Sequence, residues 1–394
     1  MKTFVRIVTW LAVLVFIFSS FKIWRMTTYS DFDVYYRAAQ QMAEGHWDMV
    51  YTLSDGASPF RYPPITLPFV RFLAAFDSQF ARQIWYYFQS LLFLGAYYYI
   101  FLAVKEIDPK RARLIVALSF LLTLRMMLDS FKIGQVASLM LFGYSVSLWA
   151  IVTNRLSVSG TTLLIPTVFK IGPGLNFLYF PLQKQSGWFK AWLGPSIPLA
   201  FVLLVTWTWL PSTEVWNALW AGWKMVVTSD SQYIDSSHYG SQSVLSFFLR
   251  LSKSGVFSAE TAKVMTKVIS LFGIGALLGF WWKFVPKNTY EKAVSFSLGV
   301  FPYLWFMPQT FKYSQHMILL PLALLLVKTE WNKKHGLKLA VIIFYAITMA
   351  IAGKDVVGAT LHEFNQMKSL PLFATVLIAI TLIREVRNSN KTFI

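Results

Sequence analysis

Long apolar runs recur along the whole 394-residue chain, and they constrain its fold more than any other feature. Uncharged runs of about 17 to 22 residues are long enough to cross the hydrocarbon core of a bilayer as a helix. A helix also satisfies its own backbone hydrogen bonds where no water is present. The composition agrees with this interpretation, since 56% of the residues are hydrophobic. The sequence therefore predicts an all-α, polytopic integral membrane protein.

The apolar runs predict about eleven or twelve membrane helices in a single domain that covers residues 1–394. In chain order, the predicted spans are 7–24, 83–104, 114–124, 133–153, 158–182, 191–210, 262–282, 293–307, 314–328, 338–352 and 370–383. The span 158–182 is interrupted by Pro166, Lys170 and Pro173, so we expect short or broken helices that line a cavity there. No cleavage pattern of small residues follows the first span, which we expect to be a retained anchor.

Lysine and arginine flank the predicted spans, and their placement predicts the orientation of the chain. Basic residues precede the first span and fill alternate loops and the C-terminal tail, so the positive-inside rule places both termini in the cytoplasm. Two long loops, about 25–82 and 211–260, then lie on the outer face and are expected to form the active-site face. We expect a multi-pass protein of the bacterial inner membrane, with its site on the periplasmic side.

The same flanking pattern explains the formal net charge of +18 without nucleic acid as a partner, because no basic domain lies outside the membrane. The chain contains no cysteine, which excludes disulfides, iron–sulfur clusters and thiolate chemistry. No catalytic triad, Gly-rich dinucleotide loop, Walker A sequence or zinc-ligand cluster is present. An enzyme that faces outward would therefore need an activated substrate that crosses the membrane as a lipid, such as a polyprenyl-phosphate sugar.

The first outer loop contains two aspartates, and each has two interpretations. Ser30 and Asp33 match a helix capping box, and the apolar positions after them predict an amphipathic helix in the membrane interface. The cap does not require Asp31, whose carboxylate could act as a general base on a sugar hydroxyl or interact with the helix dipole. Together the two carboxylates could also bind Mg²⁺ or Mn²⁺ beside a lipid phosphate, although such spacing is common.

Several basic residues are candidates for holding that phosphate. Arg61 lies in Phe-Arg-Tyr-Pro-Pro, where paired prolines restrict the backbone, and its guanidinium could bind a phosphate or snorkel to the interface. Lys132, on the short outer turn 125–132, is a second phosphate candidate. Lys170 is ionisable at membrane depth, which marks either a function or snorkelling.

Three polar positions complete the set derived from the residues alone. Gln135 enters a span, where a polar amide serves helix packing or substrate contact. Gln242 could hydrogen-bond a sugar from the second long outer loop. His316, at the outer mouth of a late span, could donate to a phosphate oxygen or be a polar interfacial residue.

The order of these motifs resembles that of the GT-C glycosyltransferases, and within them the polyprenyl-phosphate-mannose-dependent α-mannosyltransferases, which include phosphatidylinositol mannoside mannosyltransferases. The resemblance begins with Asp31-Phe32-x-Val34-Tyr35-Tyr36-x-Ala38-Ala39, Gly45, Tyr51 and Arg61-Tyr62-Pro63-Pro64. It continues with Gly134-Gln135, Lys170 before Pro173, Gln242-Ser243 and the stretch Pro308, His316 and Pro321. The family often has a histidine pair near its last outer motif, whereas this chain has a single histidine there, His316.

The resemblance implies transfer of a hexose, expected to be mannose, from a polyprenyl-phosphate-sugar to a glycolipid or glycan hydroxyl. Asp31 would be the catalytic base, and no cofactor is expected, with a divalent metal not favoured. The implied substrate-binding residues are Asp33, Tyr35, Arg61, Tyr62, Lys132, Gln135, Lys170, Gln242, Lys312 and His316. A transporter or flippase of polyprenyl-linked glycans is the alternative, because broken spans are typical of transporters, but the sequence lacks internal repeats.

Overall fold

The computed structural model describes residues 2–52, 58–184, 186–228, 237–308, 310–329, 336–351 and 353–391. Within these ranges the chain forms helices joined by turns and loops, without a named strand. The first half contains α1 (Lys2–Trp24), α2 (Ser30–Ala43), η1 (Trp47–Met49), η2 (Pro64–Thr66), α3 (Leu67–Arg71), η3 (Phe72–Ala75), α4 (Ser78–Ile107), α5 (Ala112–Ile133), α6 (Ala137–Val152), α7 (Leu156–Phe169), η4 (Gly172–Leu178) and α8 (Tyr179–Leu182). The second half contains α9 (Phe189–Leu193), α10 (Ser196–Trp209), α11 (Thr213–Thr228), α12 (Val244–Lys253), α13 (Ala259–Lys283), α14 (Thr289–Ser297), α15 (Val300–Phe306), η5 (Lys312–Ile318), α16 (Leu319–Val327), α17 (Gly336–Tyr345), the π-helical turn Ala346–Ile351, α18 (Lys354–Met367) and α19 (Leu370–Lys391).

Five described helices are long and apolar enough to cross a membrane, or six if a pair bent by 108° at residues 351–354 is counted as one span. They are α1, α4, α5, the run Phe189–Trp209 and α13. The all-α polytopic membrane fold is therefore confirmed. The predicted count of eleven or twelve is higher because several predicted spans consist of shorter helices. The expected break in 158–182 is present, since α7 ends at Phe169 and Lys170 is extended (φ −144°, ψ 124°).

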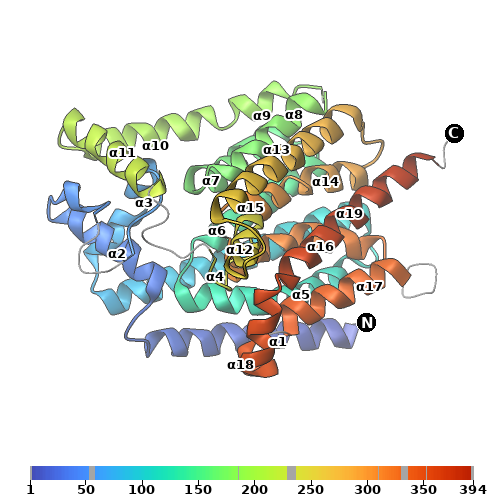
Figure 1. Ribbon diagram of the computed structural model, residues 1–394. Helices are drawn as coiled ribbons and strands as arrows, with labels where there is room; N and C mark the ends of the chain where they lie inside the picture. The colour runs from blue at the N-terminus through green and yellow to red at the C-terminus, as the bar shows by residue number, and fades with distance from the viewer. Residues whose placement is uncertain are drawn as a thin grey trace.

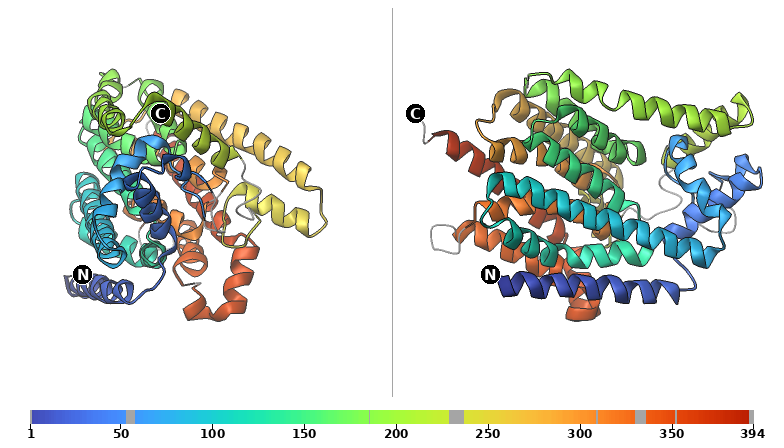
Figure 2. Two further views of the ribbon diagram at one scale, coloured as in Figure 1. Left: turned by 90° about the vertical axis from the view of Figure 1, so that its left-hand side faces the viewer. Right: turned by 180° about the vertical axis from the view of Figure 1, so that it is seen from behind.

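The long helices lie side by side and give the molecule two distinct ends (Figure 1). The start of α1 and the end of α19 lie at one end, while α2, α3 and α11 lie at the other, and the view from behind agrees (Figure 2). The helix α16 is apolar all round and buried at every position, so it forms the centre of the bundle. By contrast, α13 exposes large apolar side chains such as Leu271 (72%) and Phe272 (76%), which suit contact with lipid.

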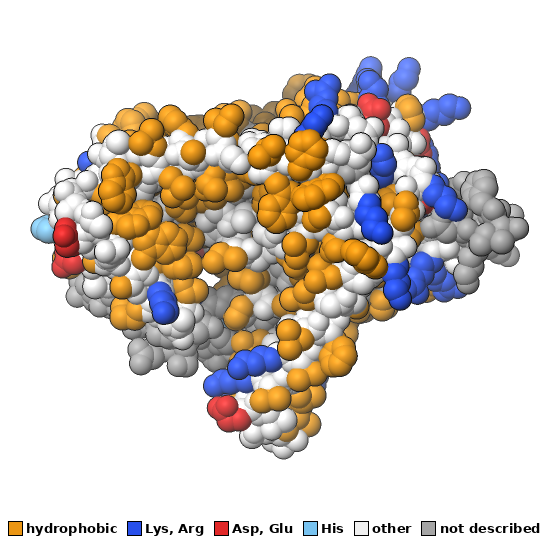
Figure 3. Space-filling view, turned by 90° about the horizontal axis from the view of Figure 1, so that it is seen from above, with side chains coloured by type: hydrophobic (Ala, Val, Ile, Leu, Met, Phe, Trp, Pro, Cys, Tyr) orange, Lys and Arg blue, Asp and Glu red, His pale blue; other side chains and the backbone are white. Residues whose placement is uncertain are grey.

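The surface charge follows the same axis. Apolar side chains cover the flank of the molecule, and Lys and Arg gather mainly at the end where α1 begins and α19 ends (Figure 3). The residues at this end include Lys184, Lys190, Lys283 and Lys287, all exposed. An apolar belt with basic residues at one end is the pattern expected of a membrane protein.

The helix α2 differs from its prediction in two respects. Ser30 is its first residue and Tyr29 is the N-cap, so Ser30 does not cap the helix. Instead, Asp33 Oδ2 accepts a hydrogen bond from the Tyr29 amide at 2.7 Å. A capping box has two reciprocal hydrogen bonds, and this is the one from the acidic side chain back to the N-cap amide. Its apolar face packs against α3, η3 and α4, so it covers the end of the bundle rather than facing lipid.

Candidate active site

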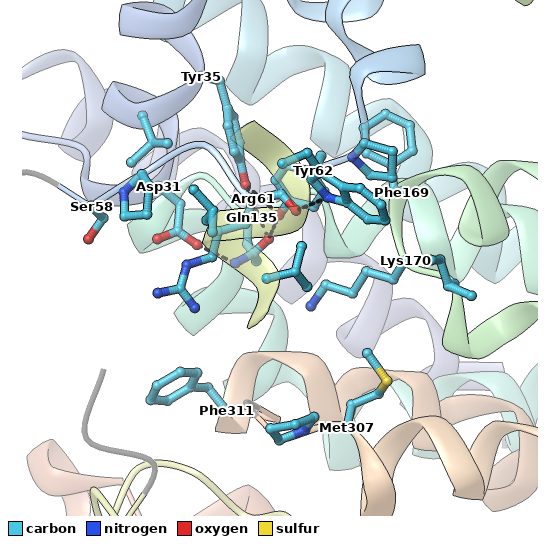
Figure 4. Close-up of a pocket in the computed structure, with 18 of the residues that line it drawn as sticks. Asp31, Tyr35, Ser58, Arg61, Tyr62, Gln135, Phe169, Lys170, Met307 and Phe311 are labelled. Atoms are coloured by element: carbon cyan, nitrogen blue, oxygen red, sulfur yellow. Dashed lines mark hydrogen bonds between the residues drawn. The ribbon is translucent and has the colours of Figure 1, made fainter. Parts of the chain in front are cut away.

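A cavity of about 270 Å³ lies at the α2 end of the molecule. Its walls come from α2, the turn 58–63, the corner between α5 and α6, the end of α7, the helix α11 and residues 307, 308, 311 and 313. Both long loops predicted for the outer face, 25–82 and 211–260, thus supply lining residues. Six of the predicted site residues line it: Asp31, Tyr35, Arg61, Tyr62, Gln135 and Lys170 (Figure 4).

The turn that carries Arg61 is fixed through its backbone. The Tyr51 hydroxyl donates to the Tyr62 carbonyl at 2.7 Å, and the Trp223 indole N–H donates to the Arg61 carbonyl at 3.1 Å. Pro63 then continues in an extended conformation, which prevents a helix from starting earlier. With the backbone held on both sides, the Arg61 guanidinium points toward the cavity and Asp31 (Figure 4).

Gln135 is placed by the tight corner between α5 and α6. Gly134 ends α5 in the left-handed conformation (φ +75°), and its carbonyl accepts the indole N–H of Trp85 at 2.7 Å. From this corner the Gln135 side chain enters the cavity, where its amide nitrogen donates to Asp31 Oδ2. The corner therefore brings a residue of the bundle into contact with α2.

The surroundings of Asp31 alter its acidity. Burial, the largest effect, raises the pKa of this carboxyl to about 6. The positive charges of Lys170 and Arg61 and hydrogen bonds to the carboxylate act in the opposite direction and limit the rise of the pKa. A carboxylate with a pKa near neutrality is a stronger base than an ordinary aspartate and is still ionised at neutral pH.

Lys170 approaches the cavity from the end of α7. Its ammonium donates to the Tyr303 hydroxyl at 3.3 Å and lies 5.6 Å from the centre of the same ring. This contact directs the charge toward the space in front of Asp31 (Figure 4). The cavity therefore combines one carboxylate with two cations from different segments, an arrangement that can accept a proton and hold an anion within one space.

Four predicted site residues do not line this cavity. Asp33 faces away from it, with Oδ1 3.4 Å from an Arg82 nitrogen. Lys132 is exposed on the last turn of α5. Gln242 is buried and donates to the carbonyls of Tyr239 (2.7 Å) and Gln366 (3.1 Å), while both ring nitrogens of His316 lie against the backbone carbonyls of Tyr313 and Ala137. The side chain of Lys312 lies outside the described part of the chain.

Other lining residues were not predicted. Trp223, Val226 and Val227 come from α11, and Met307, Phe311 and Tyr313 come from the facing segment. Most are apolar or aromatic, which looks like ordinary membrane helix in the sequence. The spacing of Trp216, Trp220 and Trp223 is the one available signal, because it places three indoles on one face of a helix in the loop 211–260.

The comparison with known families covers most of the segments that line the cavity. Residues 60–308, more than half of the chain, match the family model of glycosyltransferase family 87. The chain belongs to this family. It is thus a membrane glycosyltransferase, and the match includes Arg61, Gln135 and Lys170 but begins after Asp31. No curated protein matches the chain.

Proposed function

We propose that this glycosyltransferase moves a hexose, in the first instance mannose, from a polyprenyl-phosphate-sugar to a hydroxyl of a glycolipid or glycan on the outer face of the membrane. The observation that carries the proposal is the position of the Asp31 carboxylate in one cavity with Arg61 and Lys170. The apolar remainder of the cavity wall, which includes Phe169 and Ile171, suits a donor that arrives attached to a lipid.

The reaction is a single displacement at the anomeric carbon. The acceptor hydroxyl passes its proton to Asp31 while its oxygen forms the new bond to that carbon. The bond between the carbon and the phosphate oxygen breaks, and the electron pair leaves with polyprenyl phosphate. Arg61 and Lys170 would hold the charge that develops on this phosphate. One displacement inverts the configuration of the sugar.

The two cations take the part that a divalent metal plays in other glycosyl transfers. Among the described residues, no group of three or more His, Cys, Asp or Glu side chains could hold a metal ion. Because Arg61 and Lys170 supply two positive charges to the cavity, we expect the transfer rate to be unchanged by excess EDTA. Loss of activity in EDTA, restored by Mg²⁺ or Mn²⁺, would instead assign part of the phosphate binding to a metal.

The replacement Asp31→Asn tests the proposal. We expect purified, membrane-reconstituted protein to transfer label from radiolabelled polyprenyl-phosphate-mannose to a lipid of the host extract, and the variant to lose at least about 100-fold of that rate. The matched control is Asp48→Asn, because Asp48 is exposed in η1 of the same loop and does not line the cavity. A wild-type rate in Asp31→Asn would remove Asp31 as the base.

The same assay distinguishes mannose transfer from transfer of another hexose and from transport of the donor. Transfer from a different polyprenyl-phosphate hexose and not from the mannose donor would keep the reaction and change the sugar. Label that crosses the membrane of a liposome chemically unchanged would instead indicate a transporter or flippase.

A further inference from the structure

Gln135 makes more ordered contacts than substrate binding alone requires. Its side chain is nearly buried (6% exposed), and its amide nitrogen donates to Asp31 Oδ2. Its amide oxygen lies 2.8 Å from the Tyr62 hydroxyl, 3.2 Å from the Tyr35 hydroxyl and 3.1 Å from the Val136 amide nitrogen. Both polar atoms of the amide therefore have partners within the protein.

The orientation of this amide is fixed by its partners. A backbone N–H can only donate, so the Val136 contact identifies the side-chain atom beside it as the oxygen. That assignment leaves the NH₂ group facing Asp31. The oxygen has two lone pairs for three neighbours, and the hydroxyls of Tyr35 and Tyr62 are 3.0 Å apart. The hydrogen bonds can thus run in one direction, from Tyr35 to Tyr62, from Tyr62 to Gln135 and from Gln135 to Asp31.

We propose that Gln135 is a positioning residue that holds Asp31 Oδ2, so that Oδ1, which accepts a long hydrogen bond of 3.5 Å from the Ser30 hydroxyl, is the oxygen that receives the acceptor proton. Tyr35 and Tyr62 act indirectly, because their hydroxyls hold the Gln135 amide, which in turn holds the Asp31 carboxylate. This inference rests on the proposed function, since it assigns Asp31 as the base. It adds that the base works with one defined oxygen.

The chemistry explains why an amide suits this position. A glutamine donates to a carboxylate without adding charge, whereas a glutamate of the same size would put a second carboxylate beside Asp31 and favour its protonated form. A leucine would fill similar space but leave Oδ2 without its donor. These two replacements therefore separate the hydrogen bond from the packing.

The test is the pH dependence of kcat and KM for Gln135→Leu, Gln135→Glu and wild type, in the labelled-mannose assay above. The titratable groups around the pair are Asp31, Tyr35, Arg61, Tyr62, Lys170 and Tyr313. Burial raises the pKa of Tyr35 and Tyr62 further above neutrality, so these two hydroxyls stay protonated throughout the assay range.

For Gln135→Leu we expect kcat at neutral pH to fall about 10- to 100-fold with little change in KM, because a hydrogen bond to a charged group is lost. The acid limb of the kcat profile should move to higher pH, and further in Gln135→Glu. Tyr62→Phe should give a smaller change in the same direction. The control is Gln83→Leu, since Gln83 is also a buried glutamine (5% exposed) but lies in α4 against Ser20, outside the cavity.

The outcomes distinguish the role of Asp31 as the base from the role of Gln135 as its positioning residue. If Asp31→Asn is inactive while Gln135→Leu keeps both the wild-type kcat and the wild-type acid limb, the positioning role is wrong and the base assignment stands. An effect confined to KM would make Gln135 a substrate contact instead. If Gln135→Leu does not fold, Tyr62→Phe decides the question, and a wild-type pH profile in that variant overturns the inference. A fully active Asp31→Asn removes the proposed function itself.

Discussion

Asp31 is held in surroundings that do not favour its charged form. Burial raises its pKa to about 6, although Lys170 and Arg61 lie close enough to oppose the rise. A residue selected for stability alone would be neutral or better solvated at this position. The unfavourable environment of the ionised carboxylate is consistent with the role of a base, whose proton affinity must be increased for it to accept a proton.

The first prediction concerns the pH dependence of wild-type transfer. Because the base must be ionised to accept a proton, we expect kcat to fall tenfold per pH unit below about 6, the pKa of Asp31. Steady-state rates between pH 4.5 and 8 in the reconstituted assay would measure this. An acid limb centred near pH 4 would mean that Asp31 titrates as an ordinary aspartate.

The second prediction concerns stability. The folded protein binds the Asp31 proton more tightly than the unfolded chain does, so this group lowers the free energy of unfolding as pH rises from about 4 to about 6. Above pH 6 the loss is complete, and below pH 4 it is absent. Asp31→Asn should therefore unfold a few degrees higher than wild type at pH 7.5. This difference should vanish near pH 4, while Asp48→Asn should show none.

Sequence reasoning identified cavity-lining residues whose chemistry is unusual for a membrane protein. Asp31, Arg61 and Lys170 are charged groups beside or within apolar segments, and such groups need a reason to be there. His316 and Gln242 are polar groups beside apolar segments too, but each contacts one nearby backbone carbonyl and one from a distant segment, and the distant partner is not visible in any local pattern. Apolar lining residues such as Val226 were missed because nothing in the sequence separates them from residues that face lipid.

At the scale of elements, the corner between α5 and α6 controls how close α2 can come to Gln135. A Cβ on Gly134 would lie 2.7 Å from the Cβ of Phe32 and 3.0 Å from the Tyr29 ring. Both neighbours belong to the start of α2, which carries Asp31. Glycine is thus required here for its positive φ and for the approach of the helix.

The third prediction is that Gly134→Ala lowers both stability and activity. The left-handed backbone alone costs about 1–2 kcal/mol with a side chain present. The matched control is Gly255→Ala, because Gly255 has a similar φ of +81° but no atom within 4 Å of the added Cβ. Thermal unfolding of both variants isolates the contact with α2. Only Gly134→Ala should also reduce kcat, and an equal loss in both variants would show that the corner does not position Asp31.

The helices themselves were predictable to different degrees. Long uninterrupted helices such as α1, α4 and α13 were predicted because their length and hydropathy are sufficient to identify them. The division of 293–307 into α14 and α15, and the bend between the π-helical turn and α18, depend on packing against neighbours. The apolar face of α2 was predicted, but its burial in protein rather than lipid was not, since amphipathicity does not identify what covers a face.

At the scale of the whole molecule, the two ends differ in charge and in content. The fourth prediction uses the absence of cysteine, which allows single thiols to be introduced at either end. We expect Asp48→Cys, in η1 at the cavity end, to react with a membrane-impermeant maleimide in intact spheroplasts. Lys287→Cys, in the loop between α13 and α14, should react only after permeabilisation. The reverse labelling pattern would place the cavity on the cytoplasmic side.

Different parts of the chain supply the proton-accepting group and the apolar lining of the cavity. The carboxylate, the amide that holds it and both tyrosines lie between residues 31 and 135, whereas Val226, Val227 and Phe311 come from later segments of the chain. Substitutions at these apolar lining residues can reshape the space for sugar and acceptor while the proton-accepting group keeps its geometry. A change of acceptor therefore requires no change in the part of the chain that holds the carboxylate.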